Sequence, residues 1–325
     1  MQKRGVDDME ELIEAARLAL KTCLGVRPRE DVLVVTDDAL RDVGEGFYLA
    51  AKEIGAEAVL LSMQPREISG AEPPAVVAEA MKAARVVVVP TSKSLSHTRA
   101  RRAATEKGAR IATLPGATKE MLVRALNVNY QEMAGECARF AGMLTDGAEA
   151  LLTSPSGTHL SFSIARRRGY PDAGIYTEPG SFGNLPAGEA CIAPVEGTAE
   201  GVLVIDGSLA GWGLLEEPLT LQIRGGQAVE ARGGRAADWL VDVWRRYGEP
   251  ARLVAELGVG FNPRAAVTGK VLEDEKAKGT AHIALGDNMS MDGHNEAPVH
   301  LDGVLRRPTL ILDGRIVMDK GEPIW

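Results

Sequence analysis

Cysteine is scarce in this sequence. Its three cysteines, Cys23, Cys137 and Cys191, form neither a C-x-x-C pair nor an even set that could build a disulfide framework. A reducing compartment and buried thiols that fill the core are therefore expected. No apolar run approaches the length that spans a bilayer, and the first residues lead directly into an acidic amphipathic segment. We predict a cytoplasmic protein with no membrane partner.

Positive charge is also in deficit. The chain has 37 Lys and Arg against 45 Asp and Glu, which gives a formal net charge of −8. This balance argues against a phosphate-backbone partner, so no nucleic acid is expected. One local basic cluster is interpreted as a solvated helix face, with a contact to an anionic substrate or a dimer partner as the alternative. Its members are Lys93, His97, Arg99, Arg101 and Arg102.

Several catalytic signatures are missing. No G-x-G-x-x-G follows the first expected strand, where the acidic residues Asp37 and Asp38 would instead repel a pyrophosphate. The phosphate-binding pattern G-x-x-x-x-G-K-[ST] is absent as well. Neither H-E-x-x-H nor G-x-S-x-G occurs. The sequence therefore excludes the usual dinucleotide and P-loop sites, a mononuclear zincin and a serine hydrolase.

The first part of the chain has the pattern of an α/β domain. A chain of 325 residues that is 45% hydrophobic fits two domains better than one. Short β-branched runs at residues 31–38, 57–63, 85–90 and 109–115 alternate with helical or loop segments, the first helix being expected over residues 8–24. Continuous apolar strands between helices indicate a parallel sheet. We predict a parallel-sheet α/β domain over residues 1–145.

The second part is richer in β patterns. Residues 149–164 alternate in polarity and turn at 155–157, which is typical of a hairpin. Asp313-Gly314 between two apolar runs predicts another hairpin. One clear helix is expected over residues 234–248. We predict a β-rich α+β domain that binds metal over residues 146–325.

Three metal-ligand types cluster in this second domain: His282, His300 and Asp302. The chain has five histidines, and residues two apart in a strand face the same side, so His300 and Asp302 can reach one ion. The alternative is a core histidine plus a solvated strand edge. His282 favours the metal, because burying an unpaired imidazole in its apolar run would be costly.

Two carboxylates extend the candidate set. A Pro-Ala-Gly turn places Glu189 at the start of a strand, although an exposed strand-end acid is the alternative. Glu256 lies among apolar residues and glycines and would need a charge partner or a metal if buried. With the two histidines and Asp302 they make five ligands, which suit two ions that share a carboxylate or water. Oxygen and nitrogen ligands without thiolate favour Zn, Co or Mn.

These motifs together resemble a known family. The motifs Asn-Leu-Pro-Ala-Gly-Glu189, Ala-Glu256-Leu-Gly, Gly-Thr-Ala-His282-Ile-Ala-Leu-Gly and His300-Leu-Asp302 resemble, in order and spacing, the metal-dependent aminopeptidases typified by aminopeptidases T and S. The resemblance covers about residues 150–318. It implies a site of two divalent ions held by these five residues, and a homodimer that encloses the active sites.

The resemblance implies metal-assisted hydrolysis of N-terminal residues from peptides. Glu256 and Glu275 are then the candidate bases, and Lys276 or Asn288 could contact the oxyanion. This chain has Asp287-Asn288-Met289 where the family's peptidases carry a tyrosine.

Two alternatives stay open. The same superfamily includes ring-cleaving dioxygenases of the dihydroxypyridine type, for which His282, His300 and Asp302 would hold one Fe(II) and leave Glu189 and Glu256 outside the ligand set. The other alternative is a metal-stabilised homologue without catalytic activity.

Overall fold

The structure is a computed structural model that describes residues 2–325, with side chains described from residue 8 onward. The chain forms two compact units. Unit 1 comprises the residues up to 131 together with Gly174–Ala187, and unit 2 comprises Glu132–Ala173 and Gly188–Trp325. The predicted boundary after residue 145 stays a prediction for the domain limits. The chain passes from unit 1 to unit 2 after residue 131. The segment Gly174–Ala187 belongs to unit 1 again and adds one strand to its sheet.

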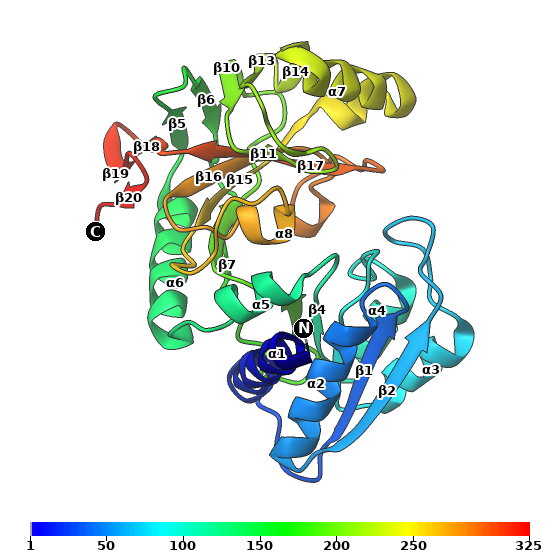
Figure 1. Ribbon diagram of the computed structural model, residues 1–325. Helices are drawn as coiled ribbons and strands as arrows, with labels where there is room; N and C mark the ends of the chain where they lie inside the picture. The colour runs from blue at the N-terminus through cyan, green and yellow to red at the C-terminus, as the bar shows by residue number, and fades with distance from the viewer. Residues whose placement is uncertain (1) are drawn as a thin grey trace. The chain divides into compact units, whose positions relative to one another are not determined.

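Unit 1 is built on one parallel sheet, sheet A. Its strands in spatial order are β2 (Glu57–Met63), β1 (Asp31–Asp37), β3 (Val86–Val89), β4 (Arg110–Thr113) and β8 (Phe182–Asn184). Its helices are α1 (Gln2–Thr22), α2 (Arg41–Ile54), α3 (Ala75–Ala83), α4 (Arg99–Glu106) and α5 (Lys119–Ala125). Figure 1 shows α2 packed along β1 and β2.

The apolar runs of the sequence explain this sheet. All four residues of β3 and all four of β4 are buried, as continuous apolar strands of a parallel sheet should be. The predicted parallel-sheet α/β class is thereby confirmed. Strand β8 was not predicted. It has three residues, includes Gly183, and joins the sheet only through its distant partner β4.

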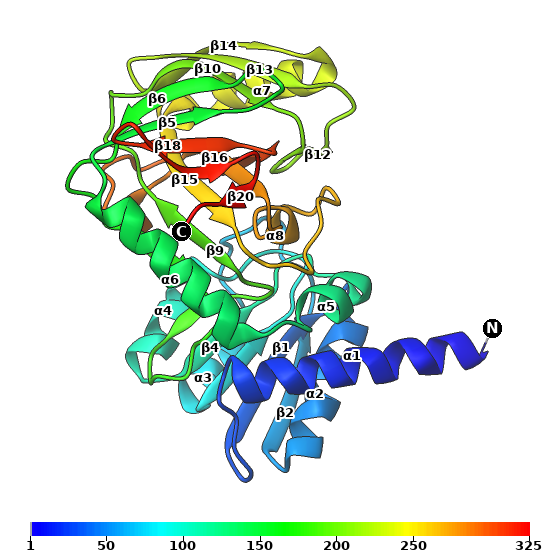
Figure 2. The same ribbon diagram turned by 90° about the vertical axis from the view of Figure 1, so that its left-hand side faces the viewer.

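Unit 2 contains two largely antiparallel sheets. Sheet B consists of β14 (Gln227–Arg232), β13 (Leu219–Arg224), β10 (Glu200–Ile205), β6 (His159–Ser163), β5 (Glu149–Thr153), β18 (Thr309–Leu312), β19 (Arg315–Asp319) and β20 (Glu322–Pro323). The predicted hairpins are present as β5–β6 and β18–β19. Helix α7 (Gly234–Tyr247) lies along β13 and β14 (Figure 2) and matches the predicted helix.

Sheet C carries the candidate site. Its strands in order are β12 (Gly213–Leu214), β11 (Ser208–Leu209), β17 (His300–Arg306), β16 (Thr280–Gly286), β15 (Val254–Gly260), β9 (Glu189–Ile192) and β7 (Tyr170–Asp172). Every residue of β9, β15 and β16 is buried. The remaining elements are α6 (Tyr130–Asp146), α8 (Val271–Asp274), and the 3-10 turns η1 (Glu249–Arg252) and η2 (Met289–Met291).

Within residues 2–325, no helix combines the length and the apolar character needed to cross a membrane.

Candidate metal centre

The strand register of sheet C gathers the predicted ligands on one face. Directly paired residues of antiparallel strands point to the same side of the sheet, as do residues two apart in one strand. His282 pairs with Val304 and with Gly258, while Asp302 pairs with Ala284. Glu256 also pairs with Ala284, and Gly260 pairs with Glu189. His282, His300, Asp302, Glu256 and Glu189 therefore project from four adjacent strands to a common side.

His300 is joined to two carboxylates at one end of this cluster. Its Nε2 atom lies 3.0 Å from Glu256 Oε2 and 3.3 Å from Asp302 Oδ1. Its Nδ1 atom forms a 2.7 Å hydrogen bond with the carbonyl oxygen of Asp287. Since a carbonyl can only accept, Nδ1 carries the proton and Nε2 is turned to the carboxylates. This is the arrangement of a histidine whose Nε2 binds a metal.

His282 occupies the centre of the cluster. Its side chain is 1% exposed, and its Nε2 atom lies 3.4 Å from Glu256 Oε1 and 3.5 Å from Glu189 Oε2. A Cβ atom on Gly258 would lie 2.1 Å from the Cε1 and Nε2 atoms of this ring. Only glycine at this cross-strand position leaves room for the imidazole to lie over the sheet. The neighbouring strand is therefore shaped to hold His282.

Lys276 supplies the cation of the cluster. It is 2% exposed, and its Nζ atom forms ion pairs with Glu189 Oε1, with Glu275 Oε1 at 2.8 Å and with Asp172 Oδ2 at 3.7 Å. A buried ammonium is tolerated because these carboxylates compensate its charge. Burial would lower the pKa of Lys276, but the charges of Glu189 and Glu275 raise it well above its ordinary value.

Carboxyl groups outnumber the ammonium group of Lys276 in this cluster. Five carboxyl groups either contact Lys276 or one of the two histidines or share a group of possible metal ligands with a histidine. They belong to Asp172, Glu189, Glu256, Glu275 and Asp302. Burial raises the pKa of Glu189 to about 8 despite the nearby charge of Lys276. Burial would lower the pKa of His282, but its hydrogen bond to Glu256 and the surrounding carboxylates raise it to about 9. The cluster thus attracts positive charge.

The donor atoms fit a divalent cation. Ligand atoms of Glu256, His300 and Asp302 lie within 4.8 Å of one another, and so do those of Glu275, His282 and Asp302. Two buried polar atoms of the cluster, His282 Nδ1 and Glu189 Oε2, have no hydrogen-bond partner among the described residues. Buried polar groups are normally satisfied, so a cluster that is both rich in negative charge and incompletely bonded is typical of a functional site. This face of sheet C therefore has the donor atoms of a metal-binding site.

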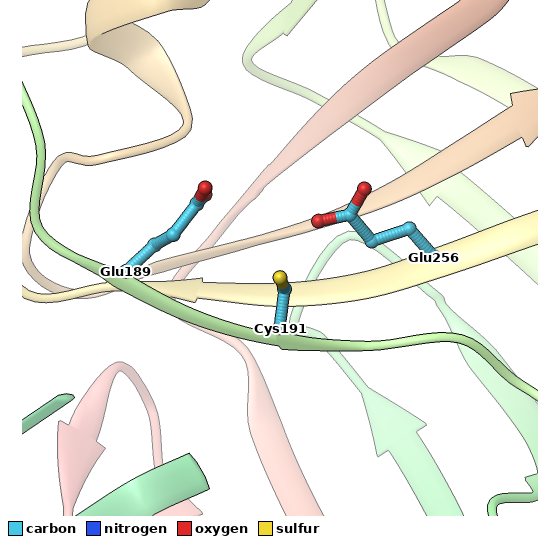
Figure 3. A group of neighbouring side chains, drawn as sticks. All are labelled: Glu189, Cys191 and Glu256. Atoms are coloured by element: carbon cyan, nitrogen blue, oxygen red, sulfur yellow. The ribbon is translucent and has the colours of Figure 1, made fainter. Parts of the chain in front are cut away.

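A cysteine adds to the cluster unexpectedly. The Sγ atom of Cys191 lies within 4.8 Å of ligand atoms of Glu189 and Glu256 (Figure 3). All three cysteines are buried and free, as predicted, but Cys191 is more than core filler. Burial raises the pKa of its thiol well above the ordinary value, and the charges of Glu256 and Glu189 raise it further. The spacing Glu189-x-Cys191 in a strand could have revealed this neighbour.

Two polar residues outside the ligand set, Asn288 and Arg167, both contact Glu196. Asn288 is fully buried, and its Nδ2 donates to Glu196 Oε1 at 2.9 Å, so its amide is engaged away from the candidate ligands. Arg167, in a run of three consecutive arginines, is 9% exposed and pairs with Glu196. Sequence proximity alone could not predict these contacts, because Glu196 lies far from both residues along the chain.

Solved structures of similar fold cover almost the whole chain. The structure of 2,5-dihydroxypyridine dioxygenase from Pseudomonas putida KT2440 is 21% identical, with a TM-score of 0.81 over 96% of each chain. Wild-type AmpT from Thermus thermophilus is 19% identical, with a TM-score of 0.74 over 97% of this chain and 99% of that one. At these sequence identities, the two likenesses show only that the folds are similar. The predicted resemblance to a group that includes both proteins is therefore right at the level of fold.

A curated relative matches part of the chain. The 2,5-dihydroxypyridine 5,6-dioxygenase of Pseudomonas putida strain KT2440 is 27% identical over 184 residues, which are 53% of this chain and 53% of the relative. The chain thus spans about half the length of the curated relative that it matches. The homodimer expected from the resemblance stays a prediction.

The preferred activity needs correction. A family model described as 2,5-dihydroxypyridine 5,6-dioxygenase matches residues 11–324, and the curated relative has the same description. The prediction of a hydrolase, a metallo-aminopeptidase acting on peptides, is therefore wrong. The oxyanion role of Lys276 and the base roles of Glu256 and Glu275 were proposed for peptide hydrolysis and no longer apply. The error arose because a shared ligand set was taken to imply shared chemistry. The chain belongs to the NicX family of 2,5-dihydroxypyridine 5,6-dioxygenases.

Proposed function

We propose that the protein is a ring-cleaving dioxygenase that binds one Fe(II) and acts on a dihydroxylated pyridine. Both atoms of O2 enter the substrate while one ring carbon–carbon bond beside a hydroxyl group breaks, so the reaction needs no external reductant. The descriptions of the family and of the curated relative support this substrate class. The chain's own cluster supports the metal.

The observation that carries the proposal is the position of Asp302 between the two histidines. Its carboxylate belongs to the donor group of His300 and also to that of His282. His282, His300 and Asp302 together make a 2-His-1-carboxylate set, which is diagnostic of non-haem Fe(II) oxygenases. Fe(II) in such a set supplies open coordination positions and the redox chemistry that O2 requires. Glu256 then serves as the charged neighbour of both histidines rather than as a ligand.

The contacts of Lys276 support one ion rather than two. Its ammonium pairs with Glu275 and with the Oε1 atom of Glu189, so the negative charge on that side of the cluster is partly compensated by the protein. A second divalent ion there would compete with the ammonium at close range, and like charges repel strongly in a buried site. The alternative of two Zn, Co or Mn ions is therefore less well supported.

Glu189 is the residue that we propose as the acceptor of a proton from the substrate. A hydroxyl group must lose its proton to bind a cation as an anion, and the acceptor must lie beside the site. The Oε2 atom of Glu189 lies 3.5 Å from His282 Nε2 and has no hydrogen-bond partner among the described residues. Its other oxygen is held by Lys276, which fixes the direction of the carboxylate.

The test is oxygen uptake by anaerobically purified, iron-loaded protein given 2,5-dihydroxypyridine. We expect close to one iron per chain by plasma mass spectrometry, consumption of O2 with the substrate, and two labelled oxygen atoms in the product when ¹⁸O2 is used. Protein loaded with zinc instead of iron is the control and should consume no O2, because Zn²⁺ has no redox chemistry.

Two variants distinguish the ligands from their neighbour. His282→Ala should lose iron and oxygen uptake together, whereas Glu256→Gln, which keeps the shape of the side chain, should retain iron. Absence of oxygen uptake by protein that holds a full complement of iron would contradict the dioxygenase assignment. Loss of iron from Glu256→Gln together with its retention in His282→Ala would contradict the proposed ligand set.

A further inference from the structure

The two histidines are held in place by different means. His282 is 1% exposed and is fixed by packing against the backbone of Gly258. The side chain of His300 is 34% exposed and stands at the first position of β17. Packing alone therefore restrains the His300 ring less. Its orientation depends on polar contacts at both ring nitrogens, and at Nδ1 the contact is the 2.7 Å hydrogen bond to the carbonyl oxygen of Asp287.

Asp287 opens the segment 287–299, which connects β16 to β17, and Asn288 organises this segment. Asn288 is fully buried, its Oδ1 accepts from the backbone N–H of Asn295 at 2.8 Å, and its backbone N–H donates to the carbonyl of Asn295 at 3.1 Å. A Cβ atom on Gly293 would lie 2.0 Å from the amide carbon of Asn288. The segment is thus wrapped closely around one amide side chain.

Glu196 ties this segment to the rest of unit 2. It lies between β9 and β10, outside the segment, and its Oε1 atom accepts from Asn288 Nδ2 at 2.9 Å and from the backbone N–H of His294 at 2.8 Å. Its Oε2 atom pairs with Arg167, whose guanidinium also donates to the carbonyl of Asp292. Both oxygens of one carboxylate are therefore used to hold the segment, in charge-assisted bonds that are stronger than neutral ones.

We propose that Glu196 is a positioning residue which acts on the metal ligand His300 through Asn288 and Asp287. Glu196 holds the amide of Asn288, and the backbone adjoining that residue presents the Asp287 carbonyl to His300 Nδ1. Nε2 of His300 then stays directed at Asp302 and Glu256. This role rests on the proposed function, because it assumes that His300 binds the metal. The hydrogen bonds of Glu196 go to Asn288, His294 and Arg167, so its effect on His300 is indirect.

Cobalt substitution tests the role without any turnover. The visible absorption of full-length protein loaded with Co²⁺ reports which ligands surround the ion and in what geometry. We expect Glu196→Ala to shift this spectrum toward that of His300→Ala and to weaken Co²⁺ binding about 10–100-fold, the range typical of residues that orient a metal ligand. Glu230→Ala, which removes an exposed carboxylate paired with Arg232, is the matched control and should change neither.

A double-mutant cycle separates positioning from a general loss of stability. If Glu196 acts through Asn288, then Glu196→Ala should have little further effect on Co²⁺ affinity in an Asn288→Ala background. Fully additive losses would overturn the proposed path. Unfolding temperatures of the same variants, measured without metal, show whether each folds, and Glu196→Gln, which keeps an acceptor for Asn288, should recover part of the affinity.

The outcomes also separate this role from the proposed function. An unchanged Co²⁺ spectrum in His300→Ala would overturn the proposed ligand set and this role with it. A changed spectrum in His300→Ala together with a wild-type spectrum and affinity in Glu196→Ala would overturn the positioning role alone. Failure of the oxygen-uptake assay would leave the cobalt results fully interpretable.

Discussion

Two buried carboxylates, one in each unit, show how a structural acid differs from one in a functional site. Asp37 ends β1 in unit 1 and is completely buried. Its Oδ1 accepts from the backbone N–H groups of Ala39 and Leu40, both at 3.2 Å, and its Oδ2 accepts from the N–H and hydroxyl of Ser92, both at 2.7 Å. The first two bonds close the turn after β1, and the other two tie this turn to the loop that follows β3.

Glu189 in unit 2 is buried to a similar degree but is bonded differently. One oxygen pairs with Lys276, and the other has no hydrogen-bond partner among the described residues. It also stands among other carboxylates rather than among backbone N–H groups. The hydrogen bonds of Asp37 therefore stabilise the folded state. The Glu189 cluster instead keeps an unbonded carboxylate oxygen that a cation could bind. Burial of a carboxylate alone therefore does not identify a functional site. What identifies it is whether the hydrogen-bonding capacity of both oxygens is used within the protein.

The largest expected effect follows from removing the acid shared by both donor groups. Asp302→Ala should abolish iron binding, with a loss of affinity greater than the roughly 10–100-fold that residues supporting a ligand usually contribute. Iron per folded chain, measured by plasma mass spectrometry after desalting, checks this. Retention of near one iron per chain would show that Asp302 resembles Asp37 more than a ligand.

The second effect concerns the cation of the cluster. Lys276→Met should leave three carboxylates uncompensated and reduce the free energy of unfolding by about 3–5 kcal/mol, the usual result of breaking a buried ion pair. All four tryptophans belong to unit 2, so tryptophan fluorescence during urea unfolding follows that unit.

A neighbouring lysine provides the control. Lys278 pairs with Glu136 at 2.8 Å, but its side chain is 34% exposed. Lys278→Met should therefore cost no more than about 1 kcal/mol. Equal losses of unfolding free energy in the two variants would mean that solvent screens the ion pairs of Lys276 as it screens a surface pair. The charges around Glu189 would then not distinguish it from Asp37.

The third effect belongs to the structural acid. Asp37→Ala should remove the side-chain acceptor of the Ala39 and Ser92 N–H groups and destabilise unit 1 by roughly 2–4 kcal/mol. Hydrogen exchange in peptides covering β1 and β3 measures this, and iron content should stay at the wild-type value. Asp38→Ala, at an exposed position, should change exchange little. Iron loss in the Asp37 variant would break the proposed division of roles.

The sequence predicted the fold class and the ligand face because both depend on short-range patterns. Apolar runs such as 86–89 indicated the buried parallel strands, and the spacing of His300 and Asp302 placed them on one face. The roles of Lys276 and Glu196 could not be predicted, because their partners Asp172, Glu189 and Asn288 are distant in sequence. The same ligands also serve two reactions, so chemistry could not be inferred from the ligand types alone.

The smallest expected effect tests the cradle of His282. A Cβ atom at position 258 would meet the imidazole at 2.1 Å, so Gly258→Ala must displace the ring and should weaken iron binding about 10–100-fold. Gly142 lies in α6, where an added Cβ atom would meet nothing within 4 Å, so Gly142→Ala should leave iron affinity unchanged and stabilise the helix by about 0.5–1 kcal/mol. Titration of both variants with Fe(II) under argon against a chelator gives the affinities. Equal affinities would mean that the imidazole can move without losing the ion. Gly258 would then not be required to position His282 for metal binding.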